Sequence, residues 1–259
     1  LVTRDAARAA PRAARGAAIA EAAVDAVQAL RAALRCGRRA LLLNPPADPA
    51  TDTDAVETRT VGHVLEAVDG SGLEKVVAVS TGGARPGERI GDFNTLWALE
   101  EGLRRRSIPA AINRGAYYMS NWDGQLPALR DGGRLASLYP AELPIPMVAP
   151  RDIGTAAADR LQSGTDDVGV RHVEGPRRYT PADVARAFSR ALGIAVEVEE
   201  IPRARWHDAF LAQGFSGEAA QSYVRMLAET VDHGFDMPAD AIRGRTTLEE
   251  HVASLVEGA

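Results

Sequence analysis

Apolar residues along the first 120 positions alternate between two spacings. Short runs of consecutive apolar residues predict strands, and stretches with apolar residues three or four apart predict amphipathic helices. Residues 39–43 lead from Arg39 into a continuous apolar run that ends at Asn44-Pro45-Pro46, so we expect a strand buried on both faces. The pattern predicts strands over residues 1–3, 17–20, 39–43, 75–79 and 110–113, and helices over residues 24–35, 56–68 and 91–106.

Strands that alternate with helices favour right-handed βαβ units. The expected fold class is α/β, a doubly wound and mostly parallel Rossmann-like sheet with a smaller C-terminal α/β lobe. Ligands of such sheets bind at the carboxyl ends of the strands. The positions of interest are therefore Arg4, residues 44–46, residues 80–82 and residues 114–118.

The regular alternation of apolar spacings ends near residue 120, and prolines are scattered through the sequence that follows. Thr180, Pro181 and Asp183 have the order of an N-cap, a first helical residue and a first-turn acid, so a helix is expected to begin there. We divide the chain into a Rossmann-like dinucleotide-binding domain (1–120) and a smaller substrate lobe (121–259), interleaved with the last strands of the sheet. Further predictions for this part are helices over 181–192, 203–212, 216–233 and 248–256 and a strand over 196–201.

Composition narrows the class of protein. The 259 residues are 46 % hydrophobic with a formal net charge of −5, which is typical of a globular chain and disfavours a nucleic-acid partner. Apolar runs are far shorter than the roughly 20 residues of a membrane-spanning helix, so no membrane partner is expected. Cys36 is the single cysteine, which fits a reducing, cytoplasmic compartment, and we expect it to be a small buried residue.

Known catalytic motifs are largely missing. The five histidines are scattered, no Gly-x-Ser-x-Gly turn occurs, and Lys75, the single lysine, has the wrong neighbours for a phosphate-binding P-loop. We therefore expect no metal site and no P-loop nucleotide chemistry, and no residue is assigned a catalytic role.

One ordered set of segments is distinctive: residues 108–122, with Asn113-Arg114-Gly115-Ala116-Tyr117-Tyr118-Met119-Ser120-Asn121, and later Val148-Ala149-Pro150-Arg151-Asp152-Ile153-Gly154. These segments resemble the NmrA-like branch of the atypical short-chain dehydrogenase/reductases, over nearly the whole chain. Glu100 and Glu101 match paired glutamates of that family.

The resemblance implies a nicotinamide cofactor, with NADP(H) preferred over NAD(H) because the Arg4 guanidinium suits an adenosine 2′-phosphate. A surface role for Arg4, and ordinary turns at 44–46 and 80–83, stay open as alternatives. The implied cofactor-binding residues are Arg4, Asn44, Pro45, Pro46, Ser80, Thr81, Arg114, Gly115, Ala116 and Tyr117.

The family begins with a central strand and a glycine-rich loop that holds the pyrophosphate, and Leu1-Val2-Thr3 matches its second strand instead. We therefore expect a truncated chain whose sheet lacks its middle strand and which binds dinucleotide weakly or not at all.

Active short-chain reductases carry a Tyr-x-x-x-Lys pair, and here Asp92 and Leu96 stand at those positions. Hydride transfer to a quinone-like acceptor remains open, because such an acceptor takes its proton from water. Tyr118, Asn121 and Trp122 are expected to form a wall for a flat small-molecule substrate, or alternatively to pack between the lobes.

The expected function is an NAD(P)H-dependent oxidoreductase acting on quinone-like or other conjugated acceptors. A non-catalytic dinucleotide-sensing regulator and an inactive homologue are the alternatives, and a homodimer stays open.

Overall fold

A five-stranded parallel sheet organises the structure, a computed structural model that describes residues 1–235 and 238–258. Its strands lie in the order β12-β9-β5-β4-β3, and two of them, β9 and β12, come from the second half of the chain. The bounds are β3 (Arg39–Leu42), β4 (Lys75–Thr81), β5 (Ala110–Gly115), β9 (Gly169–Glu174) and β12 (Ile242–Arg243).

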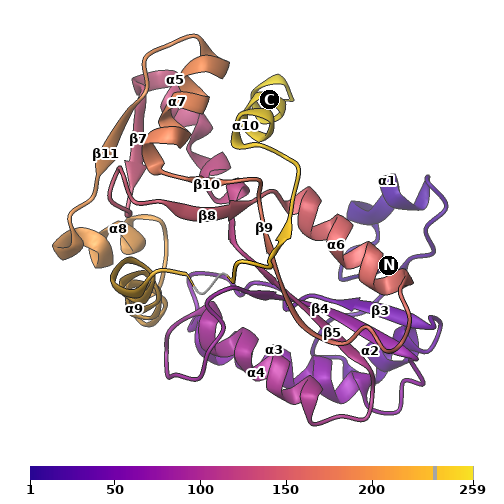
Figure 1. The fold of residues 1–259 in the computed structure, drawn as a ribbon. Coiled ribbons are helices and arrows are strands. Elements are labelled where there is room, and N and C mark those ends of the chain that lie inside the picture. The colour runs from indigo at the N-terminus through magenta and orange to yellow at the C-terminus, as the bar shows by residue number, and fades with distance from the viewer. Residues whose placement is uncertain (236–237, 259) are drawn as a thin grey trace.

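Helices cover both faces of this sheet (Figure 1). Val76 and Ala78 of β4 pack against α2 (Val27–Leu34), α3 (Thr53–Val68) and α4 (Asp92–Arg104). Val77 and Val79, which point to the other face, pack against α6 (Pro150–Gln162). This alternation along a fully buried strand is typical of a doubly wound parallel sheet, and it confirms the expected fold class.

Strand β3 does not have the burial that its sequence predicts. Leu42 is 5 % exposed against α3, but Leu41 and Leu43 on the opposite face are 41 % and 58 % exposed. Helix α6 packs on that face mainly over β4 and β5, and within the described residues the outer edge of β3 has no strand partner. The prediction of a strand buried on both faces was wrong, because an apolar run does not reveal whether a neighbour covers each face.

The first residues form a separate unit. Strands β1 (Val2–Thr3) and β2 (Ala20–Glu21) pair in parallel as a two-stranded sheet that does not join the large one. A short helix, α1 (Ala10–Ala13), lies between them in the chain. Cys36, predicted to be buried, is exposed just after the end of α2.

The second half of the chain builds a smaller lobe around its own apolar core, which includes Leu135, Met147, Tyr179 and Phe188. Thr180 caps α7 with the predicted capping box to Asp183. The strands are β6 (Tyr117–Tyr118), β7 (Arg134–Ser137), β8 (Ile145–Val148), β10 (Arg178–Tyr179) and β11 (Glu197–Glu200), and the helices are α5 (Leu126–Gly132), α7 (Pro181–Leu192), α8 (Trp206–Ala212), α9 (Gly217–His233) and α10 (Leu248–Glu257).

Helix α9 joins this lobe to the large sheet. Its N-cap residue Ser216 donates its backbone N–H to the Pro49 carbonyl at 2.8 Å and its hydroxyl to the Thr51 carbonyl at 2.9 Å, in the loop before α3. Six residues later, Ser222 donates to Asp54 of α3 and accepts from the Gly91 N–H at 2.9 Å. The N-termini of α3 and α4 therefore meet α9 at one point.

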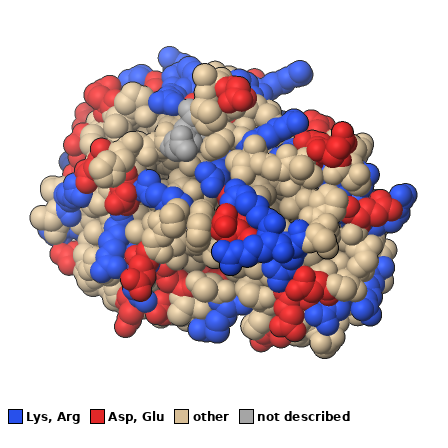
Figure 2. Space-filling model, turned by 60° about the horizontal axis from the view of Figure 1, so that its bottom comes forward, with Lys and Arg blue, Asp and Glu red and all other residues tan. Residues whose placement is uncertain are grey.

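The surface carries charges of both signs. On the face shown in Figure 2, basic and acidic side chains are interspersed. Across the described part of the chain, no helix has the length and apolar character needed to cross a bilayer.

Candidate functional site

The predicted cofactor residues of the large sheet lie at one edge. Leu42 of β3 pairs with Ala78, and Ser80 and Thr81 of β4 pair with Arg114 and Gly115 of β5. Because the three strands are adjacent and parallel, residues 44–46, 80–82 and 114–117 follow their carboxyl ends together. Sheets of this class bind ligands there.

Arg4 belongs to a different sheet. It is exposed and follows β1 of the two-stranded sheet, which is not hydrogen-bonded to the large one. The other nine predicted cofactor residues follow or end strands β3, β4 and β5 of the large sheet.

Two of the grouped side chains are already paired. Glu100 of α4, with none of its surface exposed, accepts the Ser80 hydroxyl at 2.6 Å and both Nε and Nη2 of Arg114 at 2.8 Å. Arg104 adds an ion pair at 2.9 Å. This bidentate arrangement ties β4 and β5 to α4 and compensates the buried carboxylate. Ser80 and Arg114 therefore contribute position and backbone groups at this edge, while their side chains face Glu100.

The predicted substrate residues have different surroundings. Trp122 is 3 % exposed, and its ring lies 6.0 Å from the ring of Tyr117 in the core of the small lobe. Asn121 is exposed and hydrogen bonds to the Tyr117 phenol, whose burial raises its pKa to about 12. Tyr118 is half-buried near Asp92 at the start of α4. Of these residues, Tyr118 is the one that faces the strand edge from a partly open position.

Lys75 lies at the opposite end of β4. It is completely buried, and its Nζ donates to the Ser163 hydroxyl at 2.9 Å and to the Gly164 carbonyl at 2.8 Å. Burial lowers the pKa of this amine. The single lysine therefore fastens the loop after α6 to the sheet, away from the candidate site.

A group of three carboxyl residues adjoins the strand edge. Glu57 of α3 accepts the Ala47 N–H at 3.1 Å and the Thr95 hydroxyl at 3.3 Å, and it shares a hydrogen bond with Asp92 of α4. Asp54, one turn before Glu57, accepts from Ser222. We call Asp54, Glu57 and Asp92 the carboxyl cluster.

Two members of the carboxyl cluster are buried and Asp92 is half-buried. The nearby Arg89 forms its ion pair with Asp52 instead, and the hydrogen bond to Asp52, followed by the charges of Asp52 and Asp54, raises the pKa of Arg89. Asp54 is 6 % exposed and Glu57 is 4 % exposed, and within residues 1–235 and 238–258 no ion pair includes a member of the cluster. Burial, then the charge of Asp92, raises the pKa of Glu57 to about 7. Burial also raises the pKa of Asp92. Two like charges at close range cannot both be ionised easily, so the Glu57–Asp92 pair holds one proton near neutral pH.

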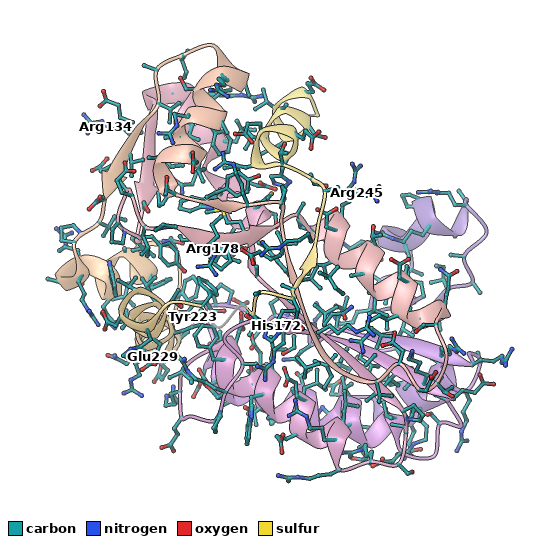
Figure 3. The ribbon with its side chains drawn as sticks, viewed as in Figure 1. Arg134, His172, Arg178, Tyr223, Glu229 and Arg245 are labelled. Carbon is teal, nitrogen blue, oxygen red and sulfur yellow. The ribbon has the colours of Figure 1, made fainter. Side chains whose placement is uncertain are left out.

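Two tyrosines border the cluster. Burial, followed by the charge of Asp92, raises the pKa of Tyr118 and of Tyr223 on α9. Figure 3 shows Tyr223 on α9, between the small lobe and the layer formed by α3 and α4. The Tyr223 ring packs edge-on against Phe215, with centroids 4.9 Å apart. Two half-buried tyrosines therefore lie within electrostatic reach of Asp92.

The sequence contains only a faint signal for the cluster. Asp54 and Glu57 are three residues apart on one helix face, and Asp92 opens the next helix. Acids in first helical turns are common because they complement the helix dipole. Their burial without a cation could therefore be recognised only in the structure.

A hollow of about 660 Å³ lies at the other edge of the sheet, between residues 68–73 and 105–109. These loops precede β4 and β5, so the hollow is remote from the strand ends where parallel sheets bind ligands. We assign it no role.

Comparison with known proteins relates the whole chain to one group of folds. Triphenylmethane reductase from Citrobacter sp. superposes with a TM-score of 0.79 at 16 % identity, over 99 % of this chain and 89 % of that one. The NADPH-dependent quinone oxidoreductase of Escherichia coli in complex with NADPH gives 0.72 at 20 % identity, over 98 % and 89 %. NmrA, a negative transcriptional regulator in complex with NAD, gives 0.63 at 15 % identity, over 93 % and 75 %.

The chain has the fold of the NmrA-like, atypical short-chain dehydrogenase/reductases. The resemblance inferred from residues 108–122 and 148–154 is thereby confirmed at the level of the fold. No protein-family model and no curated protein matches the sequence. In this NmrA-like fold, Glu100 holds the carboxyl ends of β4 and β5 against α4. The sequence motifs did not indicate the carboxyl cluster.

Proposed function

We propose that this NmrA-like chain binds a nicotinamide dinucleotide and catalyses hydride transfer to a conjugated acceptor such as a quinone. The observation that carries the proposal is the meeting of residues 44–46, 80–82 and 114–117 at the carboxyl ends of three adjacent parallel strands. Structural neighbours described as binding NADP(H) or NADPH have the same fold, which supports the choice of cofactor.

One polar atom at this edge fits the cofactor. The side-chain oxygen of Asn44, the second residue after β3, is buried and has no hydrogen-bond partner. A buried acceptor without a partner is unfavourable, and a hydroxyl or amide group of a dinucleotide would satisfy it. Thr81, Gly115 and Ala116 lie at the carboxyl ends of the next two strands, β4 and β5. Arg4 would recognise a 2′-phosphate, which is our basis for expecting NADP(H) over NAD(H).

The chemistry divides between the cofactor and the chain. A reduced nicotinamide, when bound, supplies a hydride. The chain lacks a tyrosine–lysine pair, since Asp92 and Leu96 occupy those positions, and so it is suited to acceptors that need no strong acid for reduction. Tyr118 offers an aromatic surface for a flat acceptor, and the proton that completes a quinol comes from water.

Titration with reduced dinucleotide and a neutral quinone tests this function. We expect oxidation of the dinucleotide that saturates below about 1 mM, the upper end of the usual KM range. Replacing Asn44 by Ala should raise the KM for the dinucleotide by about tenfold, equivalent to about 1.4 kcal/mol. Gln221→Ala, an exposed change on α9, is the matched control. Absence of both binding and turnover would refute the proposal.

A regulatory role is the second candidate, favoured by the missing tyrosine–lysine pair and by the likeness to NmrA, described as a negative transcriptional regulator. Binding of the dinucleotide without turnover of any acceptor would favour this alternative over catalysis.

A further inference from the structure

Glu174 ends β9 at the carboxyl edge of the large sheet, and two arginines from other strands flank its carboxylate. The side chain of Glu174 is 1 % exposed. Nε of Arg178 on β10 lies 3.4 Å from Oε1, and Nη1 of Arg243 on β12 lies 3.1 Å from Oε2. Figure 3 shows Arg178 beside β9, between the small lobe and the large sheet. Two cations therefore share one carboxylate, and the group has a net positive charge.

These ion pairs leave both arginines with unused donors. Arg114 gives Glu100 two hydrogen bonds at 2.8 Å, and its side chain is 13 % exposed. By contrast, Oε2 of Glu174 has no hydrogen-bond partner among the described residues. The side chains of Arg178 and Arg243 are each 49 % exposed. Since a guanidinium has more N–H donors than one such contact uses, both arginines retain donors for a second anion.

The position of the arginines in the sheet distinguishes between cofactor and acceptor. The predicted cofactor residues end or follow β3, β4 and β5, whereas Glu174 and Arg243 pair on β9 and β12, beyond β5. The Tyr118 ring lies over Gly115 at the end of β5, because a Cβ added at Gly115 would lie 3.1 Å from its Cε1. Gly115 in turn pairs with Val173, the residue before Glu174. The arginines therefore adjoin the strand end that carries the Tyr118 ring, on the side away from β3 and β4.

We propose that Arg178 and Arg243, positioned by Glu174, bind an anionic substituent of the conjugated acceptor, such as a carboxylate or a sulfonate. This inference rests on the proposed function and specifies its substrate class. The anion balances the net positive charge and accepts hydrogen bonds from the two guanidinium groups. The phosphates of the dinucleotide have the same chemistry, so the affinity for each source is measured.

Binding of an anthraquinone sulfonate tests the inference without any cofactor. A neutral hydroxymethyl anthraquinone of similar size is the comparison ligand, and equilibrium dialysis gives both affinities. We expect the wild type to bind the sulfonate about tenfold more tightly, and Arg178→Gln and Arg243→Gln each to remove this preference without changing the affinity for the neutral ligand. Arg134→Gln removes an exposed arginine from the far side of the small lobe and should leave both affinities unchanged.

Thermal unfolding of each variant shows whether it is folded. Where a variant is not folded, the wild type decides the matter, because its affinity for the sulfonate alone should fall severalfold between about 0.02 and about 0.5 M sodium chloride. Equal affinities of the wild type for the two anthraquinones would overturn the inference, as would an equal loss in Arg134→Gln.

Three further outcomes separate the site from the proposed function. Arginine variants that lose affinity for NADPH and keep their affinity for the sulfonate would assign the anion to the dinucleotide and overturn the acceptor assignment. Turnover of a neutral quinone without preferential binding of the sulfonate would refute the site and leave the proposed function standing. Preferential binding of the sulfonate without turnover of any acceptor would support the site and refute the function.

Discussion

Glu100 and Glu57 are two buried glutamates on neighbouring helices with opposite surroundings. Glu100 receives two hydrogen bonds from Arg114, one from Ser80 and an ion pair from Arg104. Glu57 receives only neutral donors and shares a hydrogen bond with another carboxyl group. Both side chains are almost inaccessible to solvent, so burial does not distinguish the two glutamates. They differ in whether an arginine compensates the carboxylate charge.

The compensated glutamate stabilises the fold, and the uncompensated one is held in place at the expense of stability. Buried groups whose charge is opposed by their neighbours are typical of sites that act on ligands. The comparison therefore separates a buried acid compensated by arginines, Glu100, from a buried acid without an ion pair, Glu57, on neighbouring helices.

Removing the partner of Glu100 should have the largest effect. Arg114→Met leaves a buried carboxylate with reduced compensation, and we expect a loss of about 3–5 kcal/mol in the free energy of unfolding. Urea denaturation measures it. Arg134→Met, an exposed change on β7 (Figure 3), is the control and should alter stability by less than about 0.5 kcal/mol. A loss below about 1 kcal/mol for Arg114→Met would show that compensation of the Glu100 charge by Arg114 does not stabilise the fold.

Neutralising Glu57 should act in the opposite direction. Glu57→Gln removes a buried charge that faces Asp92, and Gln can still accept from Ala47 and Thr95. We expect a gain of about 1–2 kcal/mol in the free energy of unfolding at pH 8, the size typical of relieved functional sites. A loss of stability would show that Glu57 is a structural residue like Glu100.

The pH dependence of stability should depend on Glu57. Its pKa rises from 4.5 to about 7 on folding, so between these values the folded state holds a proton that the unfolded state has lost. The contribution of this group to stability is therefore present below pH 4.5 and is lost as the pH rises to 7, by up to about 1.4 kcal/mol per pH unit. Subtracting the profile of Glu57→Gln from that of the wild type isolates the slope, and a flat difference would contradict the assignment.

Arg4→Ala should have the smallest effect on stability. The residue is exposed, so the free energy of unfolding should change by less than about 0.5 kcal/mol. If Arg4 binds a 2′-phosphate, the ratio of affinities for NADPH and NADH should fall by about tenfold. An unchanged ratio would leave Arg4 as a surface residue.

The elements that were predicted well are those whose local sequence determines them. The capping residues Thr180 and Asp183 begin α7 where expected, and β4 is buried on both faces as its apolar run indicates. Strand β3 carries the same kind of run, but its burial depends on neighbours that lie far away in the sequence. The burial of Leu41 and Leu43 therefore could not be deduced from their spacing.

The candidate site was predictable in its position and only partly in its residues. Parallel topology places residues 44–46, 80–82 and 114–117 together, and alternation of strands and helices is enough to infer that topology. Pairing of Ser80 and Arg114 with Glu100 requires knowledge of the packing of α4. The carboxyl cluster joins α3 to α4 across 35 residues of sequence, and its unusual chemistry lies in the lack of a cation, which no motif encodes.

Parallel measurements of the midpoint of thermal unfolding at pH 8 for Glu57→Gln and Glu100→Gln test the contrast most directly. The account predicts that Glu57→Gln melts at or above the wild-type temperature, while Glu100→Gln melts lower. Two variants that both melt below the wild type would contradict it.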